Sequence, residues 1–338
     1  MAESFSNIGK IEAIASLYRL SAYNPVSGLS FRCEKGGKVT TASRMYLEGL
    51  DFSLVYFPLK HLGYKCVIGV TGELYAAMAH PKLLNVVLGV SAKLDYEQVK
   101  ELWMGITVAA KEHGYEAVNL DLQPSGNGLY ISMSATGETS LLTEKRRMAA
   151  KSKDLICVSG PLGAAYLGLR LLEKGTREYD KTGQQPDMSA YKMIVGDYLR
   201  PELSSGVVSA LEDSEIYPSY AYFVSRGLSD AVKRLTRDSG LGAKIYADKI
   251  PFEGNSFQLG KELDIDPLSA AMNGGDDFRL MLVVPILYAE KFRRDFQTFE
   301  VVGHLAQPEA GEVLVTPEGL EFPLKAQGWP ENDNSNTL

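Results

Sequence analysis

The chain of 338 residues has only three cysteines and four histidines, which limits the kinds of site it can hold. The cysteines are odd in number, widely spaced and without metal-site spacing, so neither a disulfide framework nor a cysteine metal site is expected. The three cysteines are better explained as buried thiols of a protein in a reducing compartment. The segment at 1–13 also lacks the basic-then-apolar pattern of a secretory signal, so we expect a cytoplasmic protein.

The chain also lacks an excess of basic residues and any long apolar run. Its 35 Lys and Arg are outnumbered by 42 Asp and Glu, giving a net charge of −7. Binding to nucleic acid or to an anionic membrane through a basic face is therefore not expected. No apolar run reaches the length that spans a bilayer. The length is sufficient for two domains with sizeable cores.

Hydrophobic periodicity predicts strands interleaved with helices, which is an α/β (α+β) class. The clearest helix covers 95–114, and a second helix covers 163–173. Strands are predicted at 53–57, 66–70, 84–91 and 278–284, and a polar loop at 174–188. A basic link near 145 divides the chain into domains at 1–145 and 146–329. The polar tail at 330–338 is expected to be disordered.

The most informative stretch reads NGGDDFRL over 273–280 and leads into an apolar segment at 281–285. Paired glycines let the backbone turn tightly and approach a ligand closely. Adjacent carboxylates beside a buried strand are costly unless they bind something or cap the turn. Taken alone, the stretch also fits a surface turn whose acids bind their own backbone.

Other segments repeat, in order and spacing, the motifs of one family. NGGDDFRL resembles its GGEDYEL, EGLDF at 48–52 resembles EGVHF, and RMAAKSKDLICV at 147–158 resembles RxGAKxGDxIxV. LGYK at 62–65 followed by GELYAAMAHP at 72–81 resembles LGYKA…SDLAAMGAxP. VNLD at 118–121 falls on VGGD, SRGL at 225–228 on SDGL, and GW at 328–329 on a late GW. The chain thus resembles the thiamine-monophosphate kinases of the aminoimidazole ribonucleotide synthetase-like superfamily.

The resemblance implies a two-domain synthetase-like fold, with an N-terminal sheet domain that forms a homodimer and a C-terminal α/β domain. It also implies ATP and Mg²⁺ as cofactors and a nucleotide or thiamine phosphate as small-molecule partner. The implied reaction is ATP-dependent phosphorylation of thiamine monophosphate to thiamine diphosphate. Metal ions and positioning residues carry most of the catalysis of such transfers.

Site residues follow from the matched motifs, and the family's acids supply oxygen ligands of the kind that Mg²⁺ prefers. The resemblance makes Glu73 and Asp121 the catalytic acids and the residual metal ligands. It places nucleotide contacts on Asp121, Arg147, Ser225 and Ser43. It places substrate contacts on Asp51, Asp276, Asp277 and Trp329. Trp329 fits two roles equally, stacking on a thiamine-like ring or packing the C-terminal segment onto the body.

Several of the family's acids are replaced. No Asp or Glu occurs between Ser21 and Cys33, where the family has an early acidic pair. Metal-binding acids become Arg44, Phe223 and Arg226, and the last Glu of GGEDYEL becomes Arg279. Arginine keeps its charge and forms bidentate contacts with phosphate or carboxylate.

Three placements of Arg44 and Arg226 are open. They form ion pairs with Asp121 or Glu73 in a metal-free site, they hold an anion without metal, or they point to solvent. Two functions remain accordingly. One is a kinase that uses Glu73, Asp121, Arg147, Asp276 and Asp277. The other is a catalytically impaired or inactive paralogue that binds a ligand or pairs with another subunit.

Overall fold

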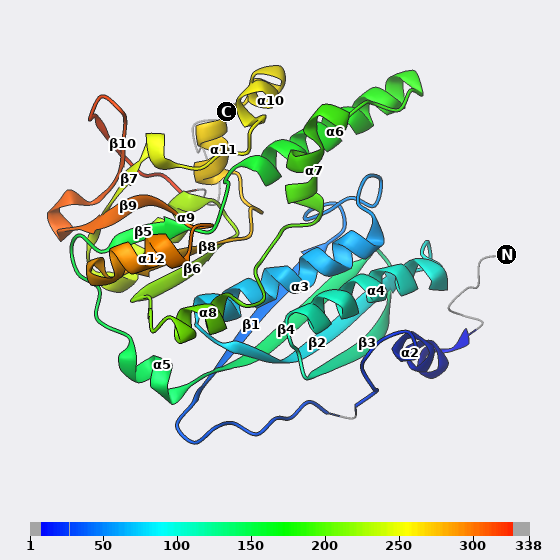
Figure 1. Ribbon diagram of the computed structural model, residues 1–338. Helices are drawn as coiled ribbons and strands as arrows, with labels where there is room; N and C mark the ends of the chain where they lie inside the picture. The colour runs from blue at the N-terminus through cyan, green and yellow to red at the C-terminus, as the bar shows by residue number, and fades with distance from the viewer. Residues whose placement is uncertain (1–7, 27, 327–338) are drawn as a thin grey trace, which may run out of the picture.

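The first of two sheets is built from residues 38–139. The computed structural model describes residues 8–26 and 28–326. Strands β1 (Lys38–Leu47), β2 (His80–Ser91), β3 (Ala117–Ser125) and β4 (Tyr130–Thr139) form a sheet in the order β1-β4-β2-β3. Only β2 and β3 are parallel. Helices α3 (Leu59–Ala76) and α4 (Tyr96–Glu112) cover one face of this sheet, and α2 (Lys10–Tyr18) lies near β3 (Figure 1).

The second sheet has seven strands in the order β11-β10-β7-β9-β5-β8-β6. Its strands are β5 (Leu155–Val158), β6 (Tyr220–Val224), β7 (Gly242–Tyr246), β8 (Arg279–Val284), β9 (Glu300–Ala306), β10 (Glu312–Val315) and β11 (Glu321–Pro323). The main helices after residue 140 are α5 (Leu141–Arg146), α6 (Ala164–Thr182), α7 (Lys192–Leu199), α8 (Val207–Asp213), α9 (Leu228–Ser239), α10 (Ser256–Leu263), α11 (Pro267–Asn273) and α12 (Ala289–Asp295). Two sheets with flanking helices confirm the predicted α/β class.

Helix α3 is the central element, because it contacts β1, β2 and β4 on one side and β6, β8 and α7 on the other. Most of its side chains are therefore buried. The prediction of a strand at 66–70 is wrong, because that segment is the middle of α3. A helix that is apolar all round has the same unbroken apolar run as a buried strand.

Two glycines bring α3 and α4 together. A Cβ on Gly63 would lie 2.2 Å from the carbonyl oxygen of Leu102, and a Cβ on Gly105 would lie 1.9 Å from that of Lys60. Any larger residue would force the helices apart. The predicted helix at 95–114 is confirmed as α4, and Asp95 and Gln98 form a reciprocal capping box at its start.

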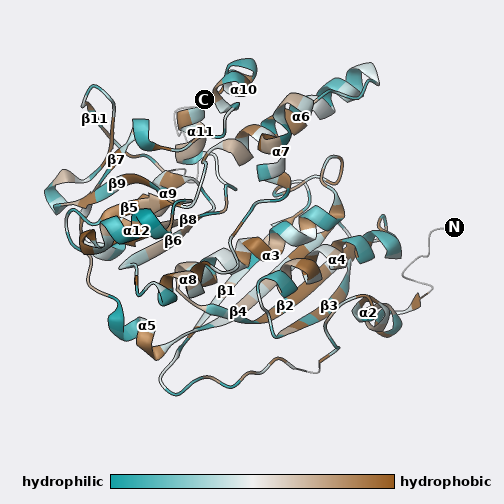
Figure 2. Cartoon of the chain, viewed as in Figure 1, coloured by the Kyte–Doolittle hydropathy of each residue, from teal (hydrophilic) through white to brown (hydrophobic). Residues whose placement is uncertain are grey.

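Other predictions differ from the structure in detail. The expected strand at 53–57 is a turn, and the expected loop at 174–188 begins with the last turns of α6. Figure 2 shows this distal part of α6 as mainly hydrophilic, which explains why its sequence resembles a loop. The tail at 330–338 lies outside the described residues. In the described part of the chain, no helix has the length and apolarity needed to cross a bilayer.

Candidate functional site

A cavity of about 480 Å³ lies between the two sheets, where β1 and α3 face the segment that joins β6 to α9. Its charged and hydroxyl-bearing lining residues come from both halves of the chain. They are Ser43, Arg44, Asp51, Glu73, Ser225, Arg226, Asp230 and Arg234. Three guanidinium groups thus face a cavity in which the family resemblance places metal-binding acids.

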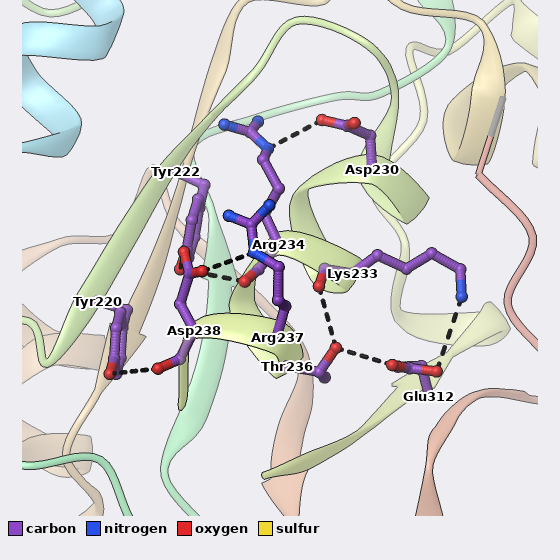
Figure 3. Close-up of polar contacts among 9 residues, drawn as sticks. All are labelled: Tyr220, Tyr222, Asp230, Lys233, Arg234, Thr236, Arg237, Asp238 and Glu312. Carbon is purple, nitrogen blue, oxygen red and sulfur yellow. Dashed lines mark hydrogen bonds and ion pairs between the residues drawn. The ribbon is translucent and has the colours of Figure 1, made fainter. Parts of the chain in front are cut away.

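Arg234 is held firmly beside this cavity by contacts within the C-terminal half. Its Nε lies 2.9 Å from Asp230 Oδ2, one helical turn earlier on α9, and its Nη2 donates to the carbonyl oxygen of Phe223 at 2.9 Å. The guanidinium also lies 5.2 Å from the centre of the Tyr222 ring. Figure 3 shows Arg234 extending from α9 beside Tyr222, with Asp230 at its tip. This arginine is therefore preorganised.

Arg44 lies on β1 and reaches across to the C-terminal half. Its Nη2 lies 3.4 Å from Asp276 Oδ1, and its guanidinium stacks within about 5 Å of the rings of Tyr46 and Phe278. The expected pairing with an acid is therefore present, but the partner is Asp276. Arg226 is exposed at the rim of the cavity and has no partner within ion-pair distance among the described residues.

Glu73, on α3, is influenced by all three arginines of the cavity. Burial raises the pKa of Glu73, while Arg234, Arg44 and Arg226 oppose that rise. The carboxylate therefore occupies a desolvated position in which three cations compensate its charge. Of the two expected acids, Glu73 is the one that the structure brings together with Arg44 and Arg226.

Lys65, also on α3, is fully enclosed next to the site. Its Nζ lies 2.9 Å from Asp276 Oδ2, donates to the carbonyl oxygen of Tyr198 at 2.8 Å, and stands 3.7 Å above the Tyr198 ring. Burial lowers the pKa of Lys65, and Asp276 opposes that shift. Asp276 thus accepts from two cations of the N-terminal half. Its backbone, like that of Phe278, has positive φ, which indicates a strained segment held by these contacts.

Asp277 has a different role from its neighbour. Its carboxylate accepts from the backbone N–H of Gly163 at 2.9 Å and of Ala165 at 3.3 Å, at the start of α6. Burial raises the pKa of Asp277 to about 7, against the opposing effect of these amides and Arg279. The predicted turn at 273–280 exists, and its second acid caps a helix more than 100 residues earlier in the chain.

Arg279, which stands where the resemblance places a Glu of the family, also makes structural contacts. Its Nη2 lies 3.0 Å from Asp197 Oδ1, and its other nitrogens donate to the carbonyl oxygens of Pro161 and Glu202. Only 8% of this residue is exposed. Arg279 therefore ties β8 to the α6 and α7 region.

The other predicted residues divide into those that reach the cavity and those that do not. Ser43, Asp51 and Ser225 line it. Asp121 is on the other edge strand of the first sheet, where its Oδ1 lies 2.6 Å from Lys10 Nζ. Arg147 donates to the carbonyl oxygen of Ala77 at the end of α3. Trp329 lies outside the described residues.

Phe223 stands where the resemblance places a metal-binding acid of the family. Its ring is fully buried against Phe278 and over Gly72, where an added Cβ would lie 2.1 Å from the ring. A carboxylate at this position would be enclosed by hydrocarbon. Phe223 is therefore part of the hydrophobic core.

The donor set does not fit Mg²⁺. Residues 8–26 and 28–326 contain no cluster of three or more His, Cys, Asp or Glu side chains able to hold a metal ion. Within the cavity, the acids Asp51, Glu73 and Asp230 face three arginines, Arg44, Arg226 and Arg234, whose positive charges repel a dication. Asp121 is engaged with Lys10 instead. Arg226 is exposed and has no ion-pair partner in the described part of the chain, so the cavity suits an anion better than a metal ion.

Sequence reasoning missed three residues of this region: Lys65, Asp230 and Arg234. Lys65 stood within the matched LGYK segment but was given no role. Asp230 and Arg234 occur four residues apart at the start of an amphipathic helix, a spacing that predicts a pair on one face. That spacing was the available signal for both.

Comparison with known proteins finds sequences and structures that are similar to this chain. No family model matches the chain. Thiamine-monophosphate kinase of Methanopyrus kandleri is 25% identical over 260 residues, 76% of each chain. The enzyme of the same name from Pyrococcus horikoshii is 27% identical over 267 residues, 79% of this chain and 78% of that one. The resemblance to thiamine-monophosphate kinases is thereby confirmed over most of the chain.

Solved structures confirm the synthetase-like fold. AaThiL complexed with AMPPCP and TMP superposes with a TM-score of 0.70 at 20% identity, covering 94% of this chain and 97% of that one. HypE of E. coli, a hydrogenase maturation protein, superposes with a TM-score of 0.71 at 16% identity, covering 95% and 98%. At these identities the likeness concerns the fold.

Proposed function

We propose that this chain, a divergent relative of the thiamine-monophosphate kinases, binds a phosphate-bearing small molecule in the cavity between its sheets without a divalent metal ion. We further propose that transfer of a phosphoryl group is weak or lost. The observation that carries the proposal is the set of three guanidinium groups, Arg44, Arg226 and Arg234, around the cavity that Glu73 also lines.

The guanidinium groups supply what a metal ion supplies elsewhere, namely positive charge next to phosphate oxygens. Among the described residues only Arg226 of the three has no ion-pair partner, since Arg44 and Arg234 already contact Asp276 and Asp230. Ser43 and Ser225 add hydroxyl groups at the wall. Arginine forks bind phosphate bidentately, so Arg226 is suited to make the principal ligand contact.

The nature of the ligand is suggested by a neighbour of the same fold, AaThiL, whose solved complex holds AMPPCP and TMP. A nucleotide and a thiamine phosphate are therefore the first ligands to examine. Both carry the phosphate that three arginines would recognise. Transfer between them is a separate matter, because it requires charge neutralisation in the transition state and an aligned acceptor.

The kinase itself is the second candidate, favoured by the curated relatives. It would need Glu73, Asp121, Arg147, Asp276 and Asp277 at one centre. In this structure Asp276 is bound by Lys65 and Arg44, and Asp277 by the amides of α6. Neither acid is free for the substrate contact that the resemblance assigns to it, which favours the binding function.

The test is a thermal-shift and calorimetric panel with ATP, ADP, thiamine monophosphate and thiamine diphosphate, each with and without Mg²⁺. A ligand that binds only the native state raises the melting temperature. We expect at least one of them to bind equally with and without Mg²⁺, and Mg²⁺-dependent ATP binding to be weaker than roughly 100 μM, about −5.5 kcal/mol. Thiamine diphosphate formation with ATP and Mg²⁺ would overturn the proposed loss of transfer.

Two variants locate the site. Arg226→Gln should weaken the ligand about tenfold or more, as expected for loss of a charged hydrogen bond. Arg237→Gln is the matched control, because Arg237 lies near the end of α9, is exposed and pairs with its neighbour Asp238. An equal effect of both variants would contradict binding in this cavity.

A further inference from the structure

A second hollow lies on the C-terminal sheet, apart from the cavity described above. It has a volume of about 720 Å³ and opens between α12, β9 and the short 3₁₀ helix η2 (Ala247–Lys249) that follows β7. Its lining shares no residue with that of the cavity between the sheets. Its size is within the range of small-molecule sites.

The floor of this hollow is aromatic. Lys244 pairs with His304 in the β7–β9 ladder, so Tyr246, two residues further along β7, faces the same side of the sheet as His304. Their rings are stacked, with centres 5.7 Å apart and planes 28° apart. Phe299 lines the same hollow. Burial, followed by the charge of Lys244, lowers the pKa of His304, so the imidazole presents a neutral face at neutral pH.

The rim of the hollow is basic. Lys153, Lys249 and Arg293 line it, with Glu300 as the single acid. Lys153 and Arg293 have no ion-pair partner within 4.0 Å among the described residues, and Lys249 contacts only its exposed neighbour Asp248. An excess of positive charge around one hollow is unusual in a chain whose net charge is −7. Cations without acidic partners are available to an anion.

We propose that this hollow binds a small molecule in which a flat ring is joined to an anionic group, a phosphate or a carboxylate. The ring would lie against the stacked pair of Tyr246 and His304, because aromatic faces bind flat heterocycles with little regard to their identity. The anion would lie at the rim between Lys153 and Arg293. This site is independent of the function proposed above.

The experiment uses the full chain carrying Arg226→Glu, which places a negative charge in the cavity between the sheets and so removes anion binding there. AMP, adenosine, inorganic phosphate and anthranilate are titrated by calorimetry. We expect AMP or anthranilate to bind at least tenfold more tightly than adenosine or phosphate alone, because both halves of the site are used. AMP and anthranilate distinguish a phosphate from a carboxylate ligand.

Variants then assign the two halves. Tyr246→Leu should weaken binding about tenfold through loss of stacking, and Lys153→Gln with Arg293→Gln should weaken it by a similar factor. Arg294→Gln is the matched control, because Arg294 is adjacent, exposed and contacts Asp295. If Tyr246→Leu does not fold, the test relies on the double variant of Lys153 and Arg293, because both side chains are exposed. Binding that is absent below 5 mM, or unchanged by the double variant, would overturn the proposal.

Discussion

Lys65 and Asp276 form an ion pair between the two halves of the molecule, with Nζ and Oδ2 2.9 Å apart. The lysine is on a buried helix and 4% of its side chain is exposed, whereas Asp276 belongs to the turn that precedes β8. The turn at 273–278 is therefore fixed by a cation from the other half of the chain. Contacts between the two halves of the chain therefore converge on Asp276.

Asp276→Asn should destabilise the protein, because it leaves Lys65 as a buried charge without its counter-ion. We expect a loss of about 2–4 kcal/mol in the free energy of unfolding, measured by urea denaturation. Lys65→Met should cost less, since Tyr198, Phe57 and Phe278 already surround this side chain. Glu116→Gln, which breaks the surface pair with Lys82, is the control and should cost less than about 1 kcal/mol. Equal effects of Asp276→Asn and Glu116→Gln would contradict this reading.

Asp277 should make stability fall as the pH rises. Its folded-state pKa is raised to about 7 from an ordinary value of 3.8. A pKa that is higher in the folded than in the unfolded state contributes stability that is fully present below the unfolded-state pKa. This contribution is lost as the pH rises to the folded-state pKa, here between about pH 4 and 7. The stability advantage of the wild type over Asp277→Asn should therefore shrink by a few kcal/mol over this interval. Parallel pH profiles of the two proteins would show that the carboxyl titrates normally.

Arg226→Asp should create an affinity for Mg²⁺ that the wild type lacks. The new carboxylate would join Asp51, Glu73 and Asp230 in one cavity and would raise the pKa of Glu73 further, since Arg226 now opposes that rise. We expect a lower melting temperature without metal and partial recovery in 10 mM Mg²⁺. Arg237→Asp, near the end of α9, should show no recovery. A variant that melts like the wild type with and without Mg²⁺ would place Arg226 outside the site.

The open face of the first sheet should form a homodimer. Helices α3 and α4 cover only one face, and the other carries Val39 and Met45, 49% and 58% exposed. Light scattering at micromolar concentration should give a dimer, and Val39→Glu with Met45→Glu a monomer. Val55→Glu, elsewhere on the surface, should leave the dimer intact. A wild-type monomer would refute the prediction.

The sequence predicted elements whose signals are local, and it missed those that depend on distant partners. The helix at 95–114 has its own capping box and apolar face, so it was found. The middle of α3 was mistaken for a strand because burial on all sides removes the helical period. The role of Asp277 depends on amides more than 100 residues away, which spacing within one segment does not reveal.

The residues of the candidate site were likewise predicted in part. The family motifs located Glu73, Arg44 and Arg226 at one cavity, because motif positions carry three-dimensional information. They did not predict that Asp121 would pair with Lys10, a residue of the preceding helix α2. Nor did they assign Lys65, whose chemistry depends on the aromatic rings that enclose it.

Helix α3 also determines how the molecule can move. The helix packs against both sheets, and Gly63 and Gly105 place its backbone directly on α4. A hinge motion between the two halves would therefore have to break the packing contacts on one side of this helix. Entry to the cavity is therefore expected through rearrangement of side chains at the rim, foremost the exposed Arg226, on a timescale of nanoseconds. Binding should accordingly proceed without a slow conformational phase.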